Sequence, residues 1–216
     1  YLPQAVVNFL ALLGWNPGTE QEIFTLDELV TAFSFERCSK SGAKFDFEKA
    51  KWFNHKYIQG TPNELLAEMI QPVLAEKNIP CDKNYAANVI GLVKERVNFV
   101  KELWDQASFF FIAPASYDEK TVKKRWKKES SAQLSELINV LQSIDDFSSE
   151  NQEIRVKQWI EEKNYPIGNI MNAFRLAVVG ESKGPHMFDI TSLLGKQETI
   201  GRLTTAITNI PAPENT

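Results

Sequence analysis

A single stretch near the start of this chain indicates its fold class: Pro3-Gln4-Ala5-Val6-Val7-Asn8-Phe9-Leu10-Ala11-Leu12-Leu13-Gly14. Its apolar residues recur at helical spacing, and Pro3 stands where the first turn of a helix tolerates proline. Gly14 follows as a residue suited to end a helix. The stretch therefore predicts a helix whose apolar positions include Val6, Val7, Phe9, Leu10 and Leu13.

The same helical period continues along the chain. Thr25-Leu26-Asp27-Glu28 and Thr61-Pro62-Asn63-Glu64 both have the spacing of a capping box, so each predicts the start of a helix. Pro72 predicts a kink in the second of these helices. The residues expected on the buried side of that helix are Leu65, Leu66, Met69, Ile70, Val73 and Leu74.

Later segments repeat the pattern. One valine stripe predicts a single helix, and Ser149-Glu150-Asn151-Gln152 is expected to cap another. Three closing helices are expected over Ile167–Val179, Phe188–Leu194 and Glu198–Ile207. No segment has the period-two alternation of a strand, so the fold class is predicted to be all-α. The stripe consists of Val89, Val93, Val97, Val100 and Trp104.

Composition excludes some classes of protein. The hydrophobic and charged contents, 43% and 24%, are those of a folded, soluble chain. No apolar run approaches the ~18 residues of a membrane-spanning helix. The start, Tyr1-Leu2-Pro3-Gln4, lacks the basic flank of a signal peptide, and we expect the chain to begin inside a longer protein. Two distant cysteines, Cys38 and Cys81, suit the cytoplasm. The net charge of −4 argues mildly against nucleic-acid binding, although charge distribution matters more.

The sequence offers little for catalysis. His55 and His186 are the only histidines, and neither has metal-ligand spacing to other donors, so we expect no metal site. No phosphate-binding glycine loop and no nucleophilic serine elbow is present. Acidic pairs such as Asp27-Glu28, Asp145-Asp146 and Glu161-Glu162 are interpreted as solvated helix faces. The isolated chain is therefore expected to be catalytically inactive.

One basic run suggests a partner. Five cations surround Trp126, and they could contact phosphates while the tryptophan stacks on a base or sugar. The alternative is a solvated helix face with Trp126 packed inward. The five cations are Lys123, Lys124, Arg125, Lys127 and Lys128.

Breaks in the pattern divide the chain into three parts. Gln59-Gly60-Thr61-Pro62 and Ala113-Pro114-Ala115-Ser116 mark the boundaries, which gives parts 1–59, 60–115 and 116–216. The tail Pro211–Thr216 is expected to be disordered.

Several blocks, in this order and spacing, resemble the bacterial glutamyl-tRNA synthetases of class I, in the part after their Lys-Ser-Lys-type signature loop. The resemblance covers nearly the whole chain and is loose between about residues 105 and 150. It implies an elongated array of helical bundles: a stem-contact remainder over 1–59 and two anticodon-binding parts over 60–115 and 116–216. The blocks are Asn8–Trp15, Glu22–Leu29, Phe33–Ser41, Phe45–Ile58, Phe174–Gly180, Gly184-Pro185, Leu193–Lys196 and Arg202-Leu203.

The resemblance implies contacts of the first part with the inner side of the tRNA. Such phosphate contacts position RNA without reading its sequence. Trp52 could equally be a core residue, and Lys49 and Lys56 could be plain surface. The candidates are Arg37, Ser39, Lys49, Trp52 and Lys56.

Arg96 is the candidate reader of the last anticodon base, as the matching arginine of the family is. On a helical wheel it lies about 60° from the centre of the valine stripe, where packing could hold its guanidinium. Cytosine offers two acceptors to that guanidinium, whereas guanine presents donors. Arginine here therefore implies preference for tRNA-Glu over tRNA-Gln. Ion pairing with Glu95 or Glu102 is the alternative.

Arg175 lies in a helix that is apolar nearly all round, where a charge needs a partner. That partner could be nucleic acid or a carboxylate such as Asp189. The turn that carries Gly184, Pro185 and Met187 matches the family's loop at the anticodon.

His186 and Met187 depart from the residues common at these positions of the loop. Either side chain could pack on a base, so the departure leaves the site in place and puts its detailed contacts in question.

The resemblance implies that the whole enzyme ligates glutamate to tRNA-Glu with ATP and Mg²⁺. Its catalytic domain would precede Tyr1, so this chain would hold no cofactor and would keep recognition without ligation. We expect a cytoplasmic monomer that binds tRNA-Glu, and neither DNA nor a membrane. Two alternatives remain: a helical protein-interaction scaffold, and a helical enzyme with an unrecognised carboxylate site.

Overall fold

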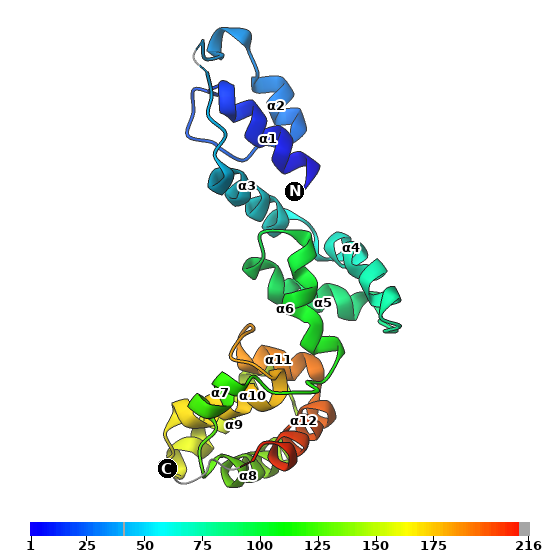
Figure 1. Cartoon of the computed structure of the whole chain (residues 1–216), viewed down its shortest axis with the longest axis vertical. Coiled ribbons are helices and arrows are strands. Elements are labelled where there is room, and N and C mark those ends of the chain that lie inside the picture. The colour runs from blue at the N-terminus through cyan, green and yellow to red at the C-terminus, as the bar shows by residue number, and fades with distance from the viewer. Residues whose placement is uncertain (41, 212–216) are drawn as a thin grey trace. The chain divides into compact units, whose positions relative to one another are not determined.

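The computed structural model describes residues 1–40 and 42–211, so most of the predicted tail lies outside the described residues. These residues form two compact units: the first ends at Gln106 and the second begins at Ala107 (Figure 1). Within the described ranges every regular element is a helix, apart from an isolated bridge between Trp15 and Cys38. The all-α prediction is confirmed. None of the described helices is long and apolar enough to cross a membrane.

The first unit begins with α1 (Pro3–Gly14), α2 (Leu26–Ala32) and α3 (Phe47–Gly60). Helix α1 packs against α3 through Phe9 and Phe53. Asn8 is fully buried beside them, and its Oδ1 accepts hydrogen bonds from the Phe24 amide (2.8 Å) and the Tyr57 hydroxyl (2.7 Å). The side of α1 that faces the core is therefore partly polar.

The end predicted for the opening helix is wrong, and some of its apolar positions are exposed. Val6, Val7 and Leu10 are exposed, because the asparagine side of the helix faces the core instead. Gly14 is the last helical residue, and the chain leaves the helix through an extended Trp15.

The two predicted capping boxes have different outcomes. At α2, the Thr25 hydroxyl accepts from the Glu28 amide while Glu28 accepts from the Thr25 amide, as predicted. At α4 (Asn63–Glu76) the prediction is wrong, because the Thr61 hydroxyl donates backwards to the Tyr57 carbonyl at the end of α3. Pro62 takes the N-cap position without a side-chain hydrogen bond.

The burial predicted for α4 is correct in part. Leu66, Ile70 and Leu74 are buried, whereas Leu65 and Met69 are exposed. Pro72 lies inside the helix, which continues past it to Glu76.

The valine stripe does not form one helix. Helix α5 (Lys83–Val93) ends in a 3₁₀ turn over Lys94–Arg96, Val97 is extended, and a second 3₁₀ turn over Val100–Glu102 leads into α6 (Leu103–Phe111). Val97 is fully buried here as an extended residue. The apolar spacing therefore extends over three short segments, and among the residues of the stripe burial is complete only at Val89, Val93 and Val97.

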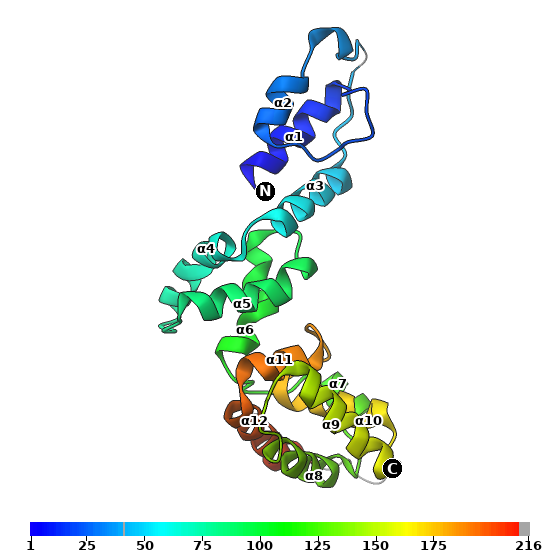
Figure 2. The same cartoon turned by 180° about the vertical axis from the view of Figure 1, so that it is seen from behind.

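The second unit contains the closing helices. Helix α10 is its central element, buried along most of its length and in contact with α7, α8, α9 and α12. The bounds predicted for α10 are confirmed, α11 begins one residue earlier than predicted, and α12 extends two residues further at each end. Figure 2 shows α8 and α12 side by side. The helices are α7 (Glu119–Arg125), α8 (Ser130–Gln142), α9 (Ser149–Glu162), α10 (Ile167–Val179), α11 (Met187–Leu194) and α12 (Lys196–Asn209).

The cap predicted for α9 is displaced by one residue. Ser148 is its N-cap and makes no side-chain capping bond. The Ser149 hydroxyl instead donates to Asp189 Oδ1 over 2.6 Å and so links α9 to α11.

Candidate nucleic-acid interface

Arg96 lies at the end of an exposed 3₁₀ turn and not on the shoulder of a helix, so its predicted placement is wrong. The side chain of Arg96 forms no hydrogen bond or ion pair with another of the residues that the structure describes. The suggested partner Glu95 accepts from Gln59, and Glu102 accepts from the amides of Asn98 and Phe99. The guanidinium of Arg96 is therefore free to approach a ligand.

The turn that carries Arg96 is held by polar side chains of α3. The Asn54 amide donates to the Asn98 carbonyl, and His55 Nδ1 lies 2.7 Å from the Val97 carbonyl oxygen. Asn54 is fully buried and its Oδ1 also accepts from the Leu2 amide at 2.6 Å. Asn54 and His55 thus fix the backbone of the two residues that follow Arg96.

Three of the stem-contact candidates share one face of α3. Lys49, Trp52 and Lys56 are separated by three and four residues, which places them within about 60° of one another on a helix. Trp52 is 37% exposed, and its ring meets the Phe53 ring edge-on at 5.0 Å. The Lys56 ammonium lies 5.9 Å from the Trp52 ring centroid, so a cation and an aromatic face are available together.

Lys49 and the two remaining stem-contact candidates, Arg37 and Ser39, have structural partners. Lys49 pairs with Glu22 at 2.8 Å. Arg37 donates to the Pro17 carbonyl, and its guanidinium packs 3.1 Å from where a Cβ on Gly18 would stand. The Ser39 amide donates to the Gly14 carbonyl over 2.8 Å. Arg37 and Ser39 therefore stabilise the segment after α1.

In the basic run, Trp126 is 1% exposed, so stacking of its ring on RNA is excluded in this structure. Its amide closes the last turn of α7 by donating to the Val122 carbonyl. The five cations around it remain at the surface, Arg125 partly covered, and no ion pair connects them with the rest of the described chain. These cations lie around the C-terminus of α7, where the helix dipole favours positive charge. The stability of the helix alone is therefore an alternative explanation for their presence.

The loop between α10 and α11 is built around two glycines. Gly180 has φ +86° and ends α10, and a Cβ there would lie 2.9 Å from Pro114 Cβ. Gly184 has φ +109°, and a Cβ would meet Phe109 Cζ, Arg175 Nη1 and Ile190 Cδ1 at 3.2–3.3 Å. Both positions therefore combine a left-handed backbone with close packing.

Arg175 is half-buried beneath this loop. Its Nη1 donates to the Lys183 carbonyl over 3.0 Å, which fastens the loop to α10. Pro185, in the same loop, is buried. A backbone carbonyl is therefore one of the hydrogen-bond acceptors that compensate for the partial burial of the Arg175 guanidinium.

The two residues after Pro185 differ in exposure. Met187 is 2% exposed and belongs to the core of α11, so its side chain does not face a ligand in this structure. The imidazole of His186 is exposed and lies 3.7 Å from Glu153 and 3.8 Å from Asp189. At this turn, the side chain presented to solvent is His186.

Arg202 is a residue for which the sequence suggested no contacts. It is 4% exposed, its Nε donates to Glu198 Oε1 over 2.7 Å, and its Nη1 donates to the carbonyls of Phe109 (2.6 Å) and Val178 (2.9 Å). The only sequence signal was a glutamate four residues before an arginine among apolar positions of a helix. Arg202 joins the ends of α6 and α10 to α12.

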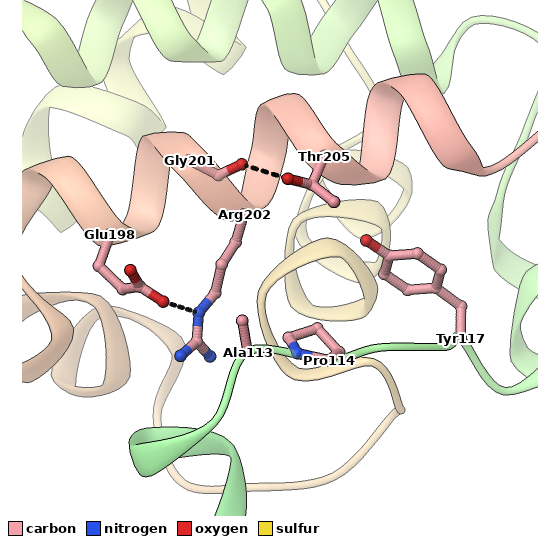
Figure 3. A pocket seen from close by; sticks show the side chains of 7 residues that line it. All are labelled: Ala113, Pro114, Tyr117, Glu198, Gly201, Arg202 and Thr205. Atoms are coloured by element: carbon pink, nitrogen blue, oxygen red, sulfur yellow. Dashed lines mark hydrogen bonds and ion pairs between the residues drawn. The ribbon is translucent and has the colours of Figure 1, made fainter. Parts of the chain in front are cut away.

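A cavity of about 250 Å³ lies beside Arg202 (Figure 3). Figure 3 shows Arg202 and Glu198 extending from α12, with Pro114 and Tyr117 on the segment after α6. Burial raises the pKa of the Tyr117 phenol, and nearby Arg202 opposes that rise. Its lining residues are Ala113, Pro114, Tyr117, Glu198, Gly201, Arg202 and Thr205.

Metal ligands are not gathered in the described ranges: no three histidine, cysteine or acidic side chains there could hold an ion together. Both cysteines are free. The candidate residues comprise cations on helical surfaces, five of them clustered within residues 123–128, and one closely packed loop. Clustered surface cations of this kind are able to neutralise the phosphates of a polyanion.

Two protein families match the chain. Residues 65–207 match the family described as anticodon binding domain, and residues 1–52 match the catalytic domain of class I tRNA synthetases (E and Q). The chain therefore belongs to the anticodon-binding domain family of the tRNA synthetases.

Known relatives narrow the class further. Glutamate–tRNA ligases of Phocaeicola vulgatus and Porphyromonas gingivalis are 58% and 60% identical over 96% of this chain, which spans 41% of their length. A crystal structure of a glutamate–tRNA ligase from Elizabethkingia meningosepticum, in complex with its amino acid, matches 98% of this chain and 42% of its own. That match has a TM-score of 0.90 at 40% identity. The chain corresponds to the C-terminal, anticodon-binding part of such ligases, and the resemblance in the sequence is confirmed.

Proposed function

We propose that this chain recognises tRNA-Glu, with residues 65–207 at the anticodon and the earlier helices at the inner stem. The family match over residues 65–207 carries the proposal. The cations of residues 123–128, which form no ion pair within the described chain, support it because RNA affinity comes largely from neutralised phosphates. A net charge of −4 is compatible with this, since the cations are clustered.

In this proposal Arg96 reads the last anticodon base. Its guanidinium has five donors and no partner among the described residues, and cytosine presents O2 and N3 as acceptors. Because Arg96 lies in a turn that Asn54 and His55 hold through the next two residues, its backbone is fixed while its side chain is exposed to solvent. Recognition would then order the side chain on binding.

The loop residues Arg175, Gly184, Pro185 and Met187 would shape the surface that packs against the anticodon bases. Gly184 allows the tight turn, and Arg175 fixes the loop through Lys183. Met187 would act from within the core by supporting α11, while His186 faces the RNA.

The division into a stem-contact part (1–59) and two anticodon-binding parts (60–115 and 116–216) belongs to the same proposal. So does the activity of the whole protein, a cytoplasmic and monomeric ligase that joins glutamate to tRNA-Glu with ATP and Mg²⁺. The relatives named glutamate–tRNA ligase support it. ATP and Mg²⁺ would be held by residues outside this chain.

The test is equilibrium binding of this chain to a tRNA-Glu transcript across a salt series. The same measurement is made with a transcript whose last anticodon base is guanine, and with Arg96→Gln. The tRNA-Glu transcript, whose last anticodon base is cytosine, is called the cytosine transcript, and the altered one the guanine transcript. We expect the wild-type chain to bind the cytosine transcript with about tenfold higher affinity, as one good base contact provides. The variant should lose this preference.

Arg155→Gln is the matched control, because Arg155 is another exposed arginine, on α9, without an ion pair among the described residues. Loss of the preference in both variants would point to a general charge effect. Binding that does not weaken with salt, or that is absent at low salt, would favour the protein-interaction scaffold.

A further inference from the structure

Two neighbouring helices of the first unit expose apolar side chains where solvated helices carry polar ones. In α1, the exposed Val6, Val7 and Leu10 point about 150° away from the buried side of the helix. Leu10 is 51% exposed. A helix that faces only water would place charged or polar residues there.

Helix α2 has the same feature. Leu26 is 60% exposed and Val30 is 73% exposed, and one helical turn separates them on one face. The apolar surface continues past the helix, where the rings of Phe33 and Phe35 meet edge-on at 5.4 Å and Phe35 is 83% exposed. Only Leu29 of α2 is buried.

We infer that these two stripes, Val6/Val7/Leu10 on α1 and Leu26/Val30 on α2, form a docking face for the remainder of a class I catalytic domain. Clustered exposed apolar residues mark interaction surfaces. Both stripes lie within residues 1–52, the range that matches the catalytic-domain family. The relatives have more than half of their length outside the region that this chain spans.

RNA fits the stripes less well as an occupant. RNA affinity comes largely from neutralised phosphates, and neither stripe contains a cation. The inference rests on the proposed place of this chain in a ligase, but it concerns a protein contact and not tRNA binding.

The experiment compares two proteins. One is this chain alone, and the other is a chimera in which the part of the Phocaeicola vulgatus ligase that precedes the matched region is joined before Tyr1. Amide hydrogen exchange over residues 3–14 and 26–32 should be slowed about tenfold or more in the chimera, whereas α9 in the second unit should be unchanged.

Substitutions then identify the face. Leu10→Lys and Val30→Lys should leave the unfolding midpoint of the chain alone nearly unchanged, since both positions are exposed, but should abolish the extra protection in the chimera. Ile154→Lys and Ile167→Lys are matched controls, because these isoleucines are 55% and 49% exposed in the second unit.

Three results would overturn the inference. In the first, exchange is equal in the two proteins. In the second, sedimentation shows that the chain alone dimerises through a contact that Leu10→Lys removes, so the occupant is a second copy. In the third, tRNA protects α1 and α2 of the chain alone. The salt-dependent tRNA binding described above is measured on the same chain, so failure of the docking face and failure of the proposed function are distinguishable.

Discussion

Arg202 donates from Nε to Glu198 Oε1 over 2.7 Å, one helical turn away, while its Nη1 satisfies two backbone carbonyls on other elements. The arginine side chain is 3% exposed and the glutamate side chain is 48% exposed. The two partners therefore stand in different environments, and their removal should have unequal consequences.

Arg202→Met should destabilise the second unit by about 3 kcal/mol, because it leaves the buried carbonyls of Phe109 and Val178 without a donor. Glu198→Gln should cost less than about 1 kcal/mol, since its side chain is about half exposed to water and the amide oxygen of glutamine still accepts from Arg202. Urea unfolding, with hydrogen exchange over α12 to assign the transition to the second unit, measures both. Equal destabilisation by the two variants would contradict this account.

Gly184→Ala should destabilise the second unit by about 2 kcal/mol. The added Cβ meets three side chains at 3.2–3.3 Å, and φ +109° is unfavourable for alanine. Gly201→Ala is the matched control, because it lies inside α12 with nothing within 4 Å of its Cβ, and it should stabilise by about 0.5–1 kcal/mol. Thermal unfolding of the two variants should shift in opposite directions.

The Glu136 carboxylate should make the second unit sensitive to acid. Its interaction with Lys163, 3.1 Å away, holds the pKa of Glu136 below the ordinary value of 4.5. Because the folded-state pKa is depressed, the contribution to stability is present above pH 4.5 and is lost as the pH falls through the folded-state pKa.

Glu136→Gln should therefore lower the free energy of unfolding by less than about 1 kcal/mol at pH 7, and the difference from the wild-type chain should shrink towards about pH 3. Urea titrations at both values measure it. Glu161→Gln, at an exposed position of α9, is the control. A difference that persists unchanged in acid would argue against an electrostatic origin.

The basic run should contribute to RNA affinity without contributing to sequence preference. Lys124→Gln with Lys128→Gln should weaken binding equally for the cytosine and guanine transcripts. The double variant should also reduce the salt slope by about 1 for each phosphate that the chain no longer neutralises. Lys157→Gln is the control, since Lys157 is already paired with Glu153 at 2.6 Å. An unchanged salt slope in the double variant would show that the basic run does not contact RNA phosphates.

The sequence allowed the fold to be predicted wherever the signal was local. The Thr25 box and the closing helices depend on residues within a few positions of one another, and both are present in the structure. The Thr61 box has the same local pattern and failed, because a carbonyl at the end of the preceding helix was the nearer partner for the hydroxyl.

Long-range contacts decide what the sequence did not reveal. The break after Val93 depends on Asn54 and His55, some forty residues earlier, and periodicity contains no information about them. The burial of Trp126 and the carbonyl partners of Arg202 likewise depend on the tertiary structure, which local sequence patterns do not reveal. The basic run was identified from its charge pattern and the other candidate site residues from the resemblance, and the contacts of both with RNA are predictions that the experiments above address.

The support of the Arg96 turn by α3 has a practical consequence for anyone who shortens this protein. A fragment cut at residue 60 would seem natural from the sequence, yet it would discard the Asn54 amide and the His55 imidazole and leave the carbonyls of Asn98 and Val97 unsatisfied. Arg96 would then be presented on an unsupported backbone. A minimal fragment for spectroscopy or crystallisation with RNA must therefore retain α3, and with it the α1 residues on which α3 packs.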